Sequence, residues 1–368
     1  MTLSVGISAE EKEGQIFLLP NESLKQVLAY CTHKILPQNY GLNPNLEEMK
    51  SSNGHKVLFL DKAHPFLEAR LTELGYDCHT DISSPKTAVE QQIGDYFGIV
   101  MRSRFSIDKS FLEKAVKLRF LAREGVGLEH IDVDFAESVG IRVLISPEGS
   151  KDTVAEHAVG MLLCLMNNLS RADRQVRSGQ WVRESNRAVE LKGKTVGILG
   201  YGNMGSALAR RLLGFGVKVL AYDKFKSGYG DDFAEEVGLE KLYEEADILS
   251  AHIPYSVDNH YFINHDFLQR FRKNIYLVNT ARGLVLNTAD LVENLKSGKV
   301  LGAALDVLEY EETSFDKFKL EHLPPAFDYL CQADNVLLSP HIAGWSFESK
   351  AKHAVVLAEK IEKLGLGI

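Results

Sequence analysis

The stretch of the chain that most constrains its fold is residues 195–223, which read TVGILGYGNMGSALARRLLGFGVKVLAYD. An apolar run ends in the pattern G-x-G-x-x-G, a helical pattern follows, and a second apolar run ends at Asp223. This order predicts a strand, a tight turn, a helix and a second strand, with an acidic residue about twenty positions after the turn. The stretch therefore predicts a dinucleotide-binding βαβ unit.

Each glycine of the pattern has its own physical reason. Gly200 permits the tight turn, Gly202 lets backbone amides approach a pyrophosphate, and Gly205 lets the helix pack closely against the strand. The helix N-terminus offers N–H groups and a positive dipole to the phosphates. Asp223 can accept hydrogen bonds from a ribose 2′-hydroxyl and would repel a 2′-phosphate, which favours NAD over NADP. The alternative is that these glycines lie in ordinary turns and that Asp223 is a surface carboxylate.

Composition limits the classes of protein that the chain can be. Its 368 residues allow two domains with sizeable cores, and its net charge of −8 argues against a general nucleic-acid binder. Its four cysteines are scattered without the spacing of a zinc site, which fits a reducing compartment. No uninterrupted apolar run is long enough to cross a bilayer, and the first residues lack a signal pattern. We expect a cytoplasmic protein that binds neither nucleic acid nor membranes.

Predicted strands and helices alternate from about Lys56 onward. Such alternation predicts mainly parallel, doubly wound sheets, in which ligands lie at the carboxyl ends of the strands. Arg102 and the glycine loop at residues 125–127 each follow a predicted strand, so both are candidates for binding an anionic substrate. The alternative for Arg102 is a surface salt bridge. Residues 1–54 fit the alternation poorly, and we interpret them as an N-terminal extension.

Three polar residues follow predicted strands in the C-terminal half, namely Arg282, Glu311 and His341. Hydride transfer at a 2-hydroxy acid requires a cation that holds the carboxylate, a base that takes the hydroxyl proton, and a carboxylate that orients the base. The three side chains match those needs, although periodicity does not show that they converge. Taken singly, His341 could be a histidine without a catalytic role, and Glu311 could be a solvated carboxylate in an acidic turn.

Six motifs together resemble the D-isomer-specific 2-hydroxyacid dehydrogenase family. They follow one another in the family's order, over a region that runs from about Lys56 to the end of the chain. The motifs are the glycine pattern at 200–205 with Asp223, REGVGLEHID at 123–132, TVAEH at 153–157, NTARG at 279–283, DVLEYE at 306–311 and SPHIAG at 339–344.

The resemblance implies an α/β fold with two doubly wound parallel-sheet domains. A Rossmann NAD domain, residues 156–337, would be inserted into a flavodoxin-like substrate domain made of residues 55–155 and 338–368. Residues 1–54 would stay outside both domains as the extension. The resemblance further implies an active-site cleft between the domains and a homodimer.

The resemblance also implies roles for individual residues. Arg282 would anchor the substrate, His341 would be the acid and base, and Glu311 would pair with His341. The implied substrate contacts are Arg102, Ser103, Val126 and Gly127. The implied cofactor contacts are Gly200, Gly202, Asn203, Met204, Gly205, Asp223, Pro254, Ala281, Asp306 and Gly344, with Thr153 near the cofactor phosphates. No metal ion is expected.

The expected activity is NAD-dependent hydride transfer at C2 of a small anionic D-2-hydroxy or 2-oxo acid. The pair 3-phosphoglycerate and 3-phosphohydroxypyruvate, from serine biosynthesis, is the first candidate, because Arg102 and the nearby Arg104 suit a phosphate as well as a carboxylate. Hydroxypyruvate or glyoxylate is the second candidate, and erythronate 4-phosphate is the third. An NAD-sensing corepressor with the same fold is the alternative from outside the enzymes.

Two features depart from the family's pattern. The segment at residues 313–334 is longer than usual, and we expect it to form a surface loop, the alternative being that it covers the cleft or a subunit interface. Trp345 directly follows the histidine motif, and its indole could either form a wall of the pocket or serve packing.

Overall fold

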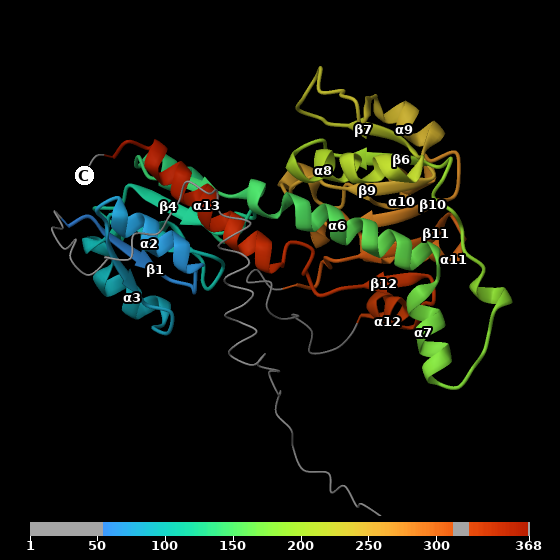
Figure 1. Cartoon of the computed structure of the whole chain (residues 1–368), viewed down its shortest axis with the longest axis horizontal. Helices are drawn as coiled ribbons and strands as arrows, with labels where there is room; N and C mark the ends of the chain where they lie inside the picture. The colour runs from blue at the N-terminus through green and yellow to red at the C-terminus, as the bar shows by residue number, and fades with distance from the viewer. Residues whose placement is uncertain (1–53, 312–323, 367–368) are drawn as a thin grey trace, which may run out of the picture. The chain divides into compact units, whose positions relative to one another are not determined.

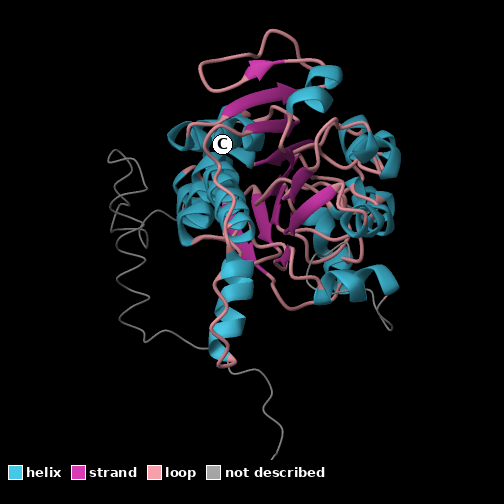
Figure 2. Cartoon of the chain, turned by 90° about the vertical axis from the view of Figure 1, so that its right-hand side faces the viewer, coloured by secondary structure: helices cyan, strands magenta, loops and turns pink. Residues whose placement is uncertain are grey.

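The computed structural model describes residues 54–311 and 324–366, so the predicted extension before residue 54 lies outside the described residues. The described residues form two parallel β-sheets with α-helices packed beside them (Figure 1). Figure 2 shows helices on both sides of the strands, as a doubly wound arrangement requires. The predicted α/β class with two parallel-sheet domains is therefore confirmed.

The first sheet contains five parallel strands, β1 (Lys56–Phe59), β2 (Asp77–Thr80), β3 (Gly98–Met101), β4 (Phe120–Arg123) and β5 (Arg142–Ile145). Their order is β2-β1-β3-β4-β5, so the chain changes direction across the sheet between β1 and β3. This is the flavodoxin-like order, and ligands in such sheets bind at that switch point. Connections between the strands include α2 (Pro65–Glu73), α3 (Lys86–Gln92), α4 (Lys109–Lys114) and α5 (Val133–Ser138).

The second sheet contains seven parallel strands in the order β12-β11-β10-β9-β6-β7-β8. They are β6 (Thr195–Leu199), β7 (Lys218–Tyr222), β8 (Glu235–Glu236), β9 (Ile248–Ala251), β10 (Ile275–Asn279), β11 (Val300–Leu305) and β12 (Val336–Leu338). Their connections include α8 (Asn203–Leu212), α9 (Leu239–Glu245), α10 (His265–Gln269) and α11 (Thr288–Lys296). Here the switch point lies between β6 and β9, so the glycine turn after β6 stands where a dinucleotide binds in such sheets.

Burial explains which strands could be predicted from the sequence. Every residue of β6 and of β9 is buried, because helices cover both faces of the sheet, and both strands read as continuous apolar runs. In contrast, β2 has the sequence DCHT, and none of its residues is fully buried. It is an edge strand beside β1, so its polar sequence is tolerated, and the sequence analysis did not predict it.

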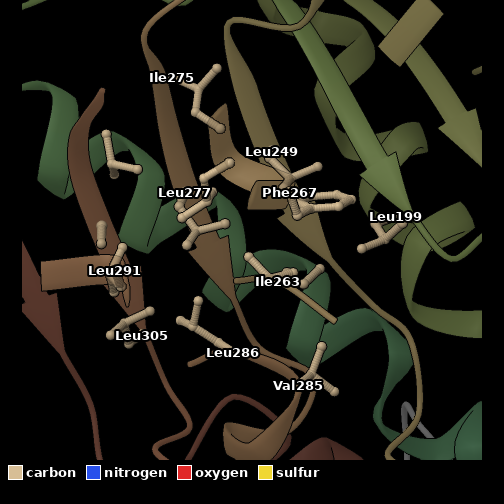
Figure 3. Close-up of a cluster of buried hydrophobic side chains, with 14 of the residues drawn as sticks. Leu199, Leu249, Ile263, Phe267, Ile275, Leu277, Val285, Leu286, Leu291 and Leu305 are labelled. Atoms are coloured by element: carbon tan, nitrogen blue, oxygen red, sulfur yellow. The ribbon is translucent and has the colours of Figure 1, made fainter. Parts of the chain in front are cut away.

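The largest apolar core lies against the second sheet, and Figure 3 shows part of it. Leu249 of β9 and Leu277 of β10 are paired in register and fully buried. Ile263 and Phe267 belong to the same cluster and come from the connection between those strands. Burying each such side chain contributes about 1.5–3 kcal/mol, so this core fixes the strand ends that carry the polar loops.

Two long helices complete the arrangement. α6 (Pro147–Met166) follows β5 and packs against both α8 and α13 (Phe347–Lys363). α13 also packs against α2, β4 and β5, so the C-terminal segment, red in Figure 1, returns to the first sheet. The predicted limit between residues 155 and 156 falls inside α6, and the domain limits stay predictions. No described helix, α6 included, combines the length and the apolarity that a membrane span requires.

The expectation of a surface loop at residues 313–334 was wrong for its C-terminal part. Residues Pro325–Gln332 form helix α12, whose Phe327 and Leu330 are buried in the core of the second sheet. Proline in the first turn favours a helix start, and the spacing of three puts the two apolar side chains on one face. The remaining residues up to 323 lie outside the described residues.

Two glycines of α6 give opposite predictions when changed to alanine. A Cβ at Gly149 would lie 2.5 Å from Nδ1 of His353 on α13, and 2.8 Å from its backbone nitrogen. Gly149→Ala should therefore lower the free energy of unfolding by about 1–3 kcal/mol through overpacking. Gly160 is exposed, and a Cβ there would meet no atom within 4 Å. Gly160→Ala should therefore raise the free energy of unfolding by about 0.5–1 kcal/mol.

Urea denaturation of the two variants beside the parent protein checks this prediction. Equal stability of Gly149→Ala and Gly160→Ala would show that α6 and α13 do not pack at the distance described.

Candidate active site

A cleft with a volume of about 1620 Å³ lies at the carboxyl ends of strands from both sheets. Its walls include loops that follow β3, β4, β6, β9, β10 and β12, and the start of α13. Parallel strands bring their carboxyl ends to one edge of a sheet, so the loops that carry most of the predicted site residues open into one space. The structure therefore provides a concave site of the size that a cofactor and a small substrate need.

The three predicted catalytic residues follow neighbouring strands. Arg282 comes after β10, Glu311 after β11 and His341 after β12, and these strands are adjacent in the sheet. Nδ1 of His341 lies 2.6 Å from Oε2 of Glu311, and Arg282 and His341 both line the cleft. A carboxylate at Nδ1 can fix the tautomer and the orientation of the imidazole ring.

The loop that carries His341 has an unusual backbone. His341 has a φ of 54°, which is the left-handed region that residues other than glycine adopt rarely. Its backbone N–H donates to the carbonyl oxygen of Asp306 at 2.7 Å. Such a conformation costs on the order of 1–3 kcal/mol and persists only where the surroundings hold it, which is typical of functional loops.

The carboxylate of Asp306 is what holds this loop. Its Oδ1 accepts hydrogen bonds from the Ser339 hydroxyl at 2.6 Å and from the backbone N–H of Ile342 at 2.9 Å. Its Oδ2 accepts from the N–H of Ala343 at 2.8 Å, and Nε2 of His157 lies 3.4 Å from Oδ1. Burial alone would raise the pKa of this carboxyl, but the hydrogen bonds that it accepts lower it. Asp306 therefore favours its ionised form and holds the loop that carries His341.

Arg282 is positioned from two sides. The buried Asn279 at the end of β10 accepts a hydrogen bond from the N–H of Ala281 and donates one to the carbonyl oxygen of Arg282, at 3.0 and 3.1 Å. The guanidinium Nε of Arg282 donates to Oε1 of Glu129. Burial opposes ionisation of Glu129, but the charge of Arg282 lowers the pKa of that carboxyl below its usual value. A Cβ at Gly127 would lie 2.5 Å from a terminal nitrogen of Arg282, so the glycine loop and the arginine are in close contact.

The glycine turn after β6 has the geometry that its sequence predicted. Gly200 has a φ of 97°, and a Cβ there would lie 2.9 Å from the carbonyl group of His252, which follows β9. Asp223 at the end of β7 accepts hydrogen bonds from the N–H groups of Tyr201 and Phe225 at 2.9 and 3.0 Å, which ties this carboxylate to the turn.

The residues around the turn fit a dinucleotide. No side chain caps the N-terminus of α8, so its first N–H groups remain available to an anion. A Cβ at Gly202 would meet no atom within 4 Å, which leaves room for phosphates against the backbone. The hydroxyl of Thr280 is buried without a hydrogen-bond partner among the described residues, and it lines the cleft. A buried polar atom without a partner is the mark expected of a site that a polar ligand completes.

The structure places the other predicted residues in two groups. One group lines the cleft, namely Arg102, Ser103, Val126, Gly127, Gly202, Asn203, Met204, Pro254, Ala281, Asp306 and Gly344. The other group, Gly200, Gly205, Asp223 and Thr153, lies outside the cleft lining. Gly200 and Gly205 shape the turn, and the hydroxyl of Thr153 lies 2.9 Å from that of Ser346 at the start of α13. Contacts of any of these residues with cofactor or substrate stay predictions.

Sequence reasoning missed several residues of the cleft. Glu129 lies within a quoted motif, but nothing in its sequence shows that it reaches Arg282 from the other sheet. Lys350 lies on α13 and lines the cleft, although sequence reasoning gave it no role. His252 also lines the cleft, and burial lowers its pKa to about 4, so it stays neutral near pH 7.

Comparison with known proteins agrees with this geometry. Residues 159–343 match the family model described as "D-isomer specific 2-hydroxyacid dehydrogenase, NAD binding domain". The match defines the chain as an NAD-dependent oxidoreductase, and it confirms NAD as the cofactor. The chain belongs to the D-isomer-specific 2-hydroxyacid dehydrogenase family, as its motifs predicted.

Relatives with curated names fall into more than one substrate class. A hydroxypyruvate reductase of Thermotoga maritima is 36% identical over 72% of this chain and 83% of its own length. A glyoxylate reductase of Thermofilum pendens is 37% identical over 69% of this chain and 74% of its own length. A D-3-phosphoglycerate dehydrogenase of Archaeoglobus fulgidus is 33% identical over 76% of this chain, which spans only 51% of that relative.

Solved structures of the family have the same fold. A D-lactate dehydrogenase from Aquifex aeolicus, in complex with NAD and lactic acid, has a TM-score of 0.70 at 28% identity, over 84% of this chain and 95% of that one. D-2-hydroxyisocaproate dehydrogenase has a TM-score of 0.71 at 27% identity, over 84% and 96% of the two chains. The relatives and structures named above are all enzymes, so the comparisons support an enzyme rather than the corepressor alternative.

Replacing the loop-holding carboxylate should affect both stability and turnover. Asp306→Asn keeps the shape but points an N–H₂ group at a backbone donor, so buried donors lose their acceptor. We expect the free energy of unfolding to fall by about 1–3 kcal/mol and kcat to fall with it, because the loop of His341 loosens. Asp334→Asn is the control, since Asp334 pairs with Arg174 at 3.0 Å on the surface and should change stability by less than about 1 kcal/mol.

This prediction is tested by comparing both variants with the parent protein in urea denaturation, steady-state kinetics and NADH titration. Loss of NADH affinity alone, with stability and kcat kept, would instead support the cofactor contact that the sequence predicts for Asp306.

Proposed function

We propose that this chain transfers hydride between NAD(H) and C2 of a small D-2-hydroxy or 2-oxo acid, with Arg282, Glu311 and His341 as the catalytic residues. The observation that carries the proposal is the 2.6 Å contact between His341 and Glu311, beside Arg282 in a cleft that also includes the glycine turn. When bound, the nicotinamide supplies or accepts the hydride.

Each residue has a role that its contacts support. Arg282, held by Glu129 and by the loop at Asn279, binds the substrate carboxylate and polarises the neighbouring carbonyl. His341 donates a proton to the carbonyl oxygen during reduction and removes it during oxidation. Glu311 orients the imidazole and stabilises its protonated form, since an anion at 2.6 Å favours the cation.

The substrate candidates differ in the group at the far end from the carboxylate. We propose 3-phosphohydroxypyruvate, whose phosphate would meet Arg102, as the first candidate, which would place the protein in serine biosynthesis. Hydroxypyruvate or glyoxylate is the second candidate, and the likeness to the reductases of Thermotoga maritima and Thermofilum pendens supports it. A cytoplasmic location and a homodimer stay predictions.

The experiment that tests the proposed function is NADH oxidation by the purified protein with a panel of 2-oxo acids. The panel contains 3-phosphohydroxypyruvate, hydroxypyruvate, glyoxylate and pyruvate. We expect turnover of at least one of them, with 3-phosphohydroxypyruvate preferred, because cationic side chains line the cleft at the first sheet. Binding of NADH without turnover of any acid would contradict the proposed function.

Removal of the imidazole tests the role of His341. His341→Ala should reduce kcat by roughly a hundred- to ten-thousandfold, which is the usual contribution of general acid–base catalysis. Affinity for NADH, measured by fluorescence titration, should stay near that of the parent protein. His260→Ala is a matched control, since this histidine lies outside the cleft lining. Loss of NADH binding in His341→Ala would assign the histidine a structural role instead.

A further inference from the structure

The switch point of the first sheet presents a cationic side chain to the cleft. Arg102 directly follows β3, and its backbone N–H donates to Oδ2 of Asp61, which follows β1, at 2.6 Å. This hydrogen bond joins the ends of the two strands between which the chain changes direction. Ligands of doubly wound sheets bind at such a point, and both residues line the cleft.

The guanidinium of Arg102 is held by an aromatic ring rather than by a carboxylate. Its Cζ lies 4.7 Å from the ring centroid of Trp345, and it makes no hydrogen bond or ion pair within residues 54–311 and 324–366. Arg104, two residues further, differs because its guanidinium donates to the carbonyl oxygens of Leu60 and Asp81 at 3.1 and 2.6 Å. Trp345 thus forms a wall of the cleft and leaves the donors of Arg102 for a ligand.

A second cation without a partner lies at the same end of the cleft. Lys350 is in the first turn of α13, is half-buried, and has no ion pair with any described residue. Lys350 lines the same cleft as Arg102 and comes five positions after Trp345, on whose ring Arg102 lies. Burial lowers the pKa of Lys350, and the charges of Arg102 and Lys62 act in the same direction, whereas the charge of Glu124 opposes them. Lys352, two positions later, differs because it pairs with Asp152 at 2.8 Å. A half-buried ammonium beside other cations is costly unless an anion completes the site.

The carboxylates nearby do not supply that anion. Glu124 is 5% exposed, and its Oε1 lies 3.5 Å from the backbone N–H of His64, but it forms no ion pair with Arg102 or Lys350. Burial raises the pKa of Glu124, whereas the two cations oppose that shift. Asp61 is engaged with the backbone of Arg102. Neither carboxylate therefore forms an ion pair with the side chain of Arg102 or Lys350.

We propose that Arg102 and Lys350 form a subsite for a second anionic group of the substrate, with Trp345 as the residue that positions Arg102. This inference rests on the proposed function, because it takes the reacting carboxylate to be at Arg282 and C2 to be at His341. Two converging cations recognise a phosphate or a carboxylate. The substrate class is then 2-oxo acids with an anionic tail, and Lys350 is the residue that selects the tail.

The test compares kcat/KM for three acids, namely 3-phosphohydroxypyruvate with a phosphate tail, oxaloacetate with a carboxylate tail and hydroxypyruvate with a neutral tail. We expect the parent protein to prefer at least one anion-tailed acid over hydroxypyruvate. Lys350→Met should lower that preference by about ten- to a hundredfold, since a hydrogen bond to a charged group contributes discrimination of this size. The anion-tailed acid that loses more identifies phosphate or carboxylate as the group bound.

Lys352→Met is the matched control for this experiment. It removes the same charge from the same helix, but Lys352 already has Asp152 as its partner. The control should keep the parent's preference, and Lys350→Arg should restore part of it. Equal preference in Lys350→Met and the parent, or an equal loss in both methionine variants, would overturn the subsite.

A binding measurement separates failure of the subsite from failure of the proposed function. The melting temperature of the protein with NAD present is measured with added 3-phosphoglycerate and, in parallel, with added glycerate. A shift specific to 3-phosphoglycerate that disappears in Lys350→Met supports the subsite even if no acid is turned over, in which case only the proposed function fails. Two results would count against the subsite in this measurement, namely an equal shift for Lys350→Met and the parent, or no shift beyond that of glycerate. If either is found and the kinetic preference does not depend on Lys350, the subsite is overturned. Turnover of a 2-oxo acid would still support the proposed function.

Discussion

The parallel pairing of β10, β11 and β12 is the constraint on which the site depends. Because the three strands run in the same direction and lie side by side, the loops after them open at one edge of the sheet. Arg282, Glu311 and His341 come from those loops, although up to 59 positions separate them in the sequence. The hydrophobic core against the sheet keeps the strands in register, so the apolar residues position the polar ones.

Two carboxylates do the finer positioning within this frame. Asp306 is 1% exposed and uses both carboxylate oxygens to hold the loop of His341 in a left-handed conformation. Glu129 reaches from a loop of the first sheet to the guanidinium of Arg282. Asp306 is buried and hydrogen-bonded, which is the condition under which a protein tolerates a buried charge. The first sheet therefore contributes to the position of Arg282 as well as to the walls of the cleft.

Much of the fold could be predicted from the sequence, and the misses have physical causes. Buried parallel strands read as apolar runs, so β6 and β9 were visible, whereas β2 is a polar edge strand and was not. Helix α12 was taken for part of a loop, because its stability comes from packing Phe327 and Leu330 into a core that local propensity does not reveal. The left-handed backbone of His341 was likewise invisible, since tertiary hydrogen bonds impose it.

The sequence by itself determined the chemistry of short stretches. The glycine turn, its acidic partner Asp223 and the residue types of the catalytic motifs depend on neighbours in the chain, so they are legible without coordinates. Only the tertiary structure decided which distant side chains meet. The contact of Glu129 with Arg282, and the presence of Lys350 and Arg102 in one cleft, depend on strand order and helix packing, which bring together residues more than 150 positions apart.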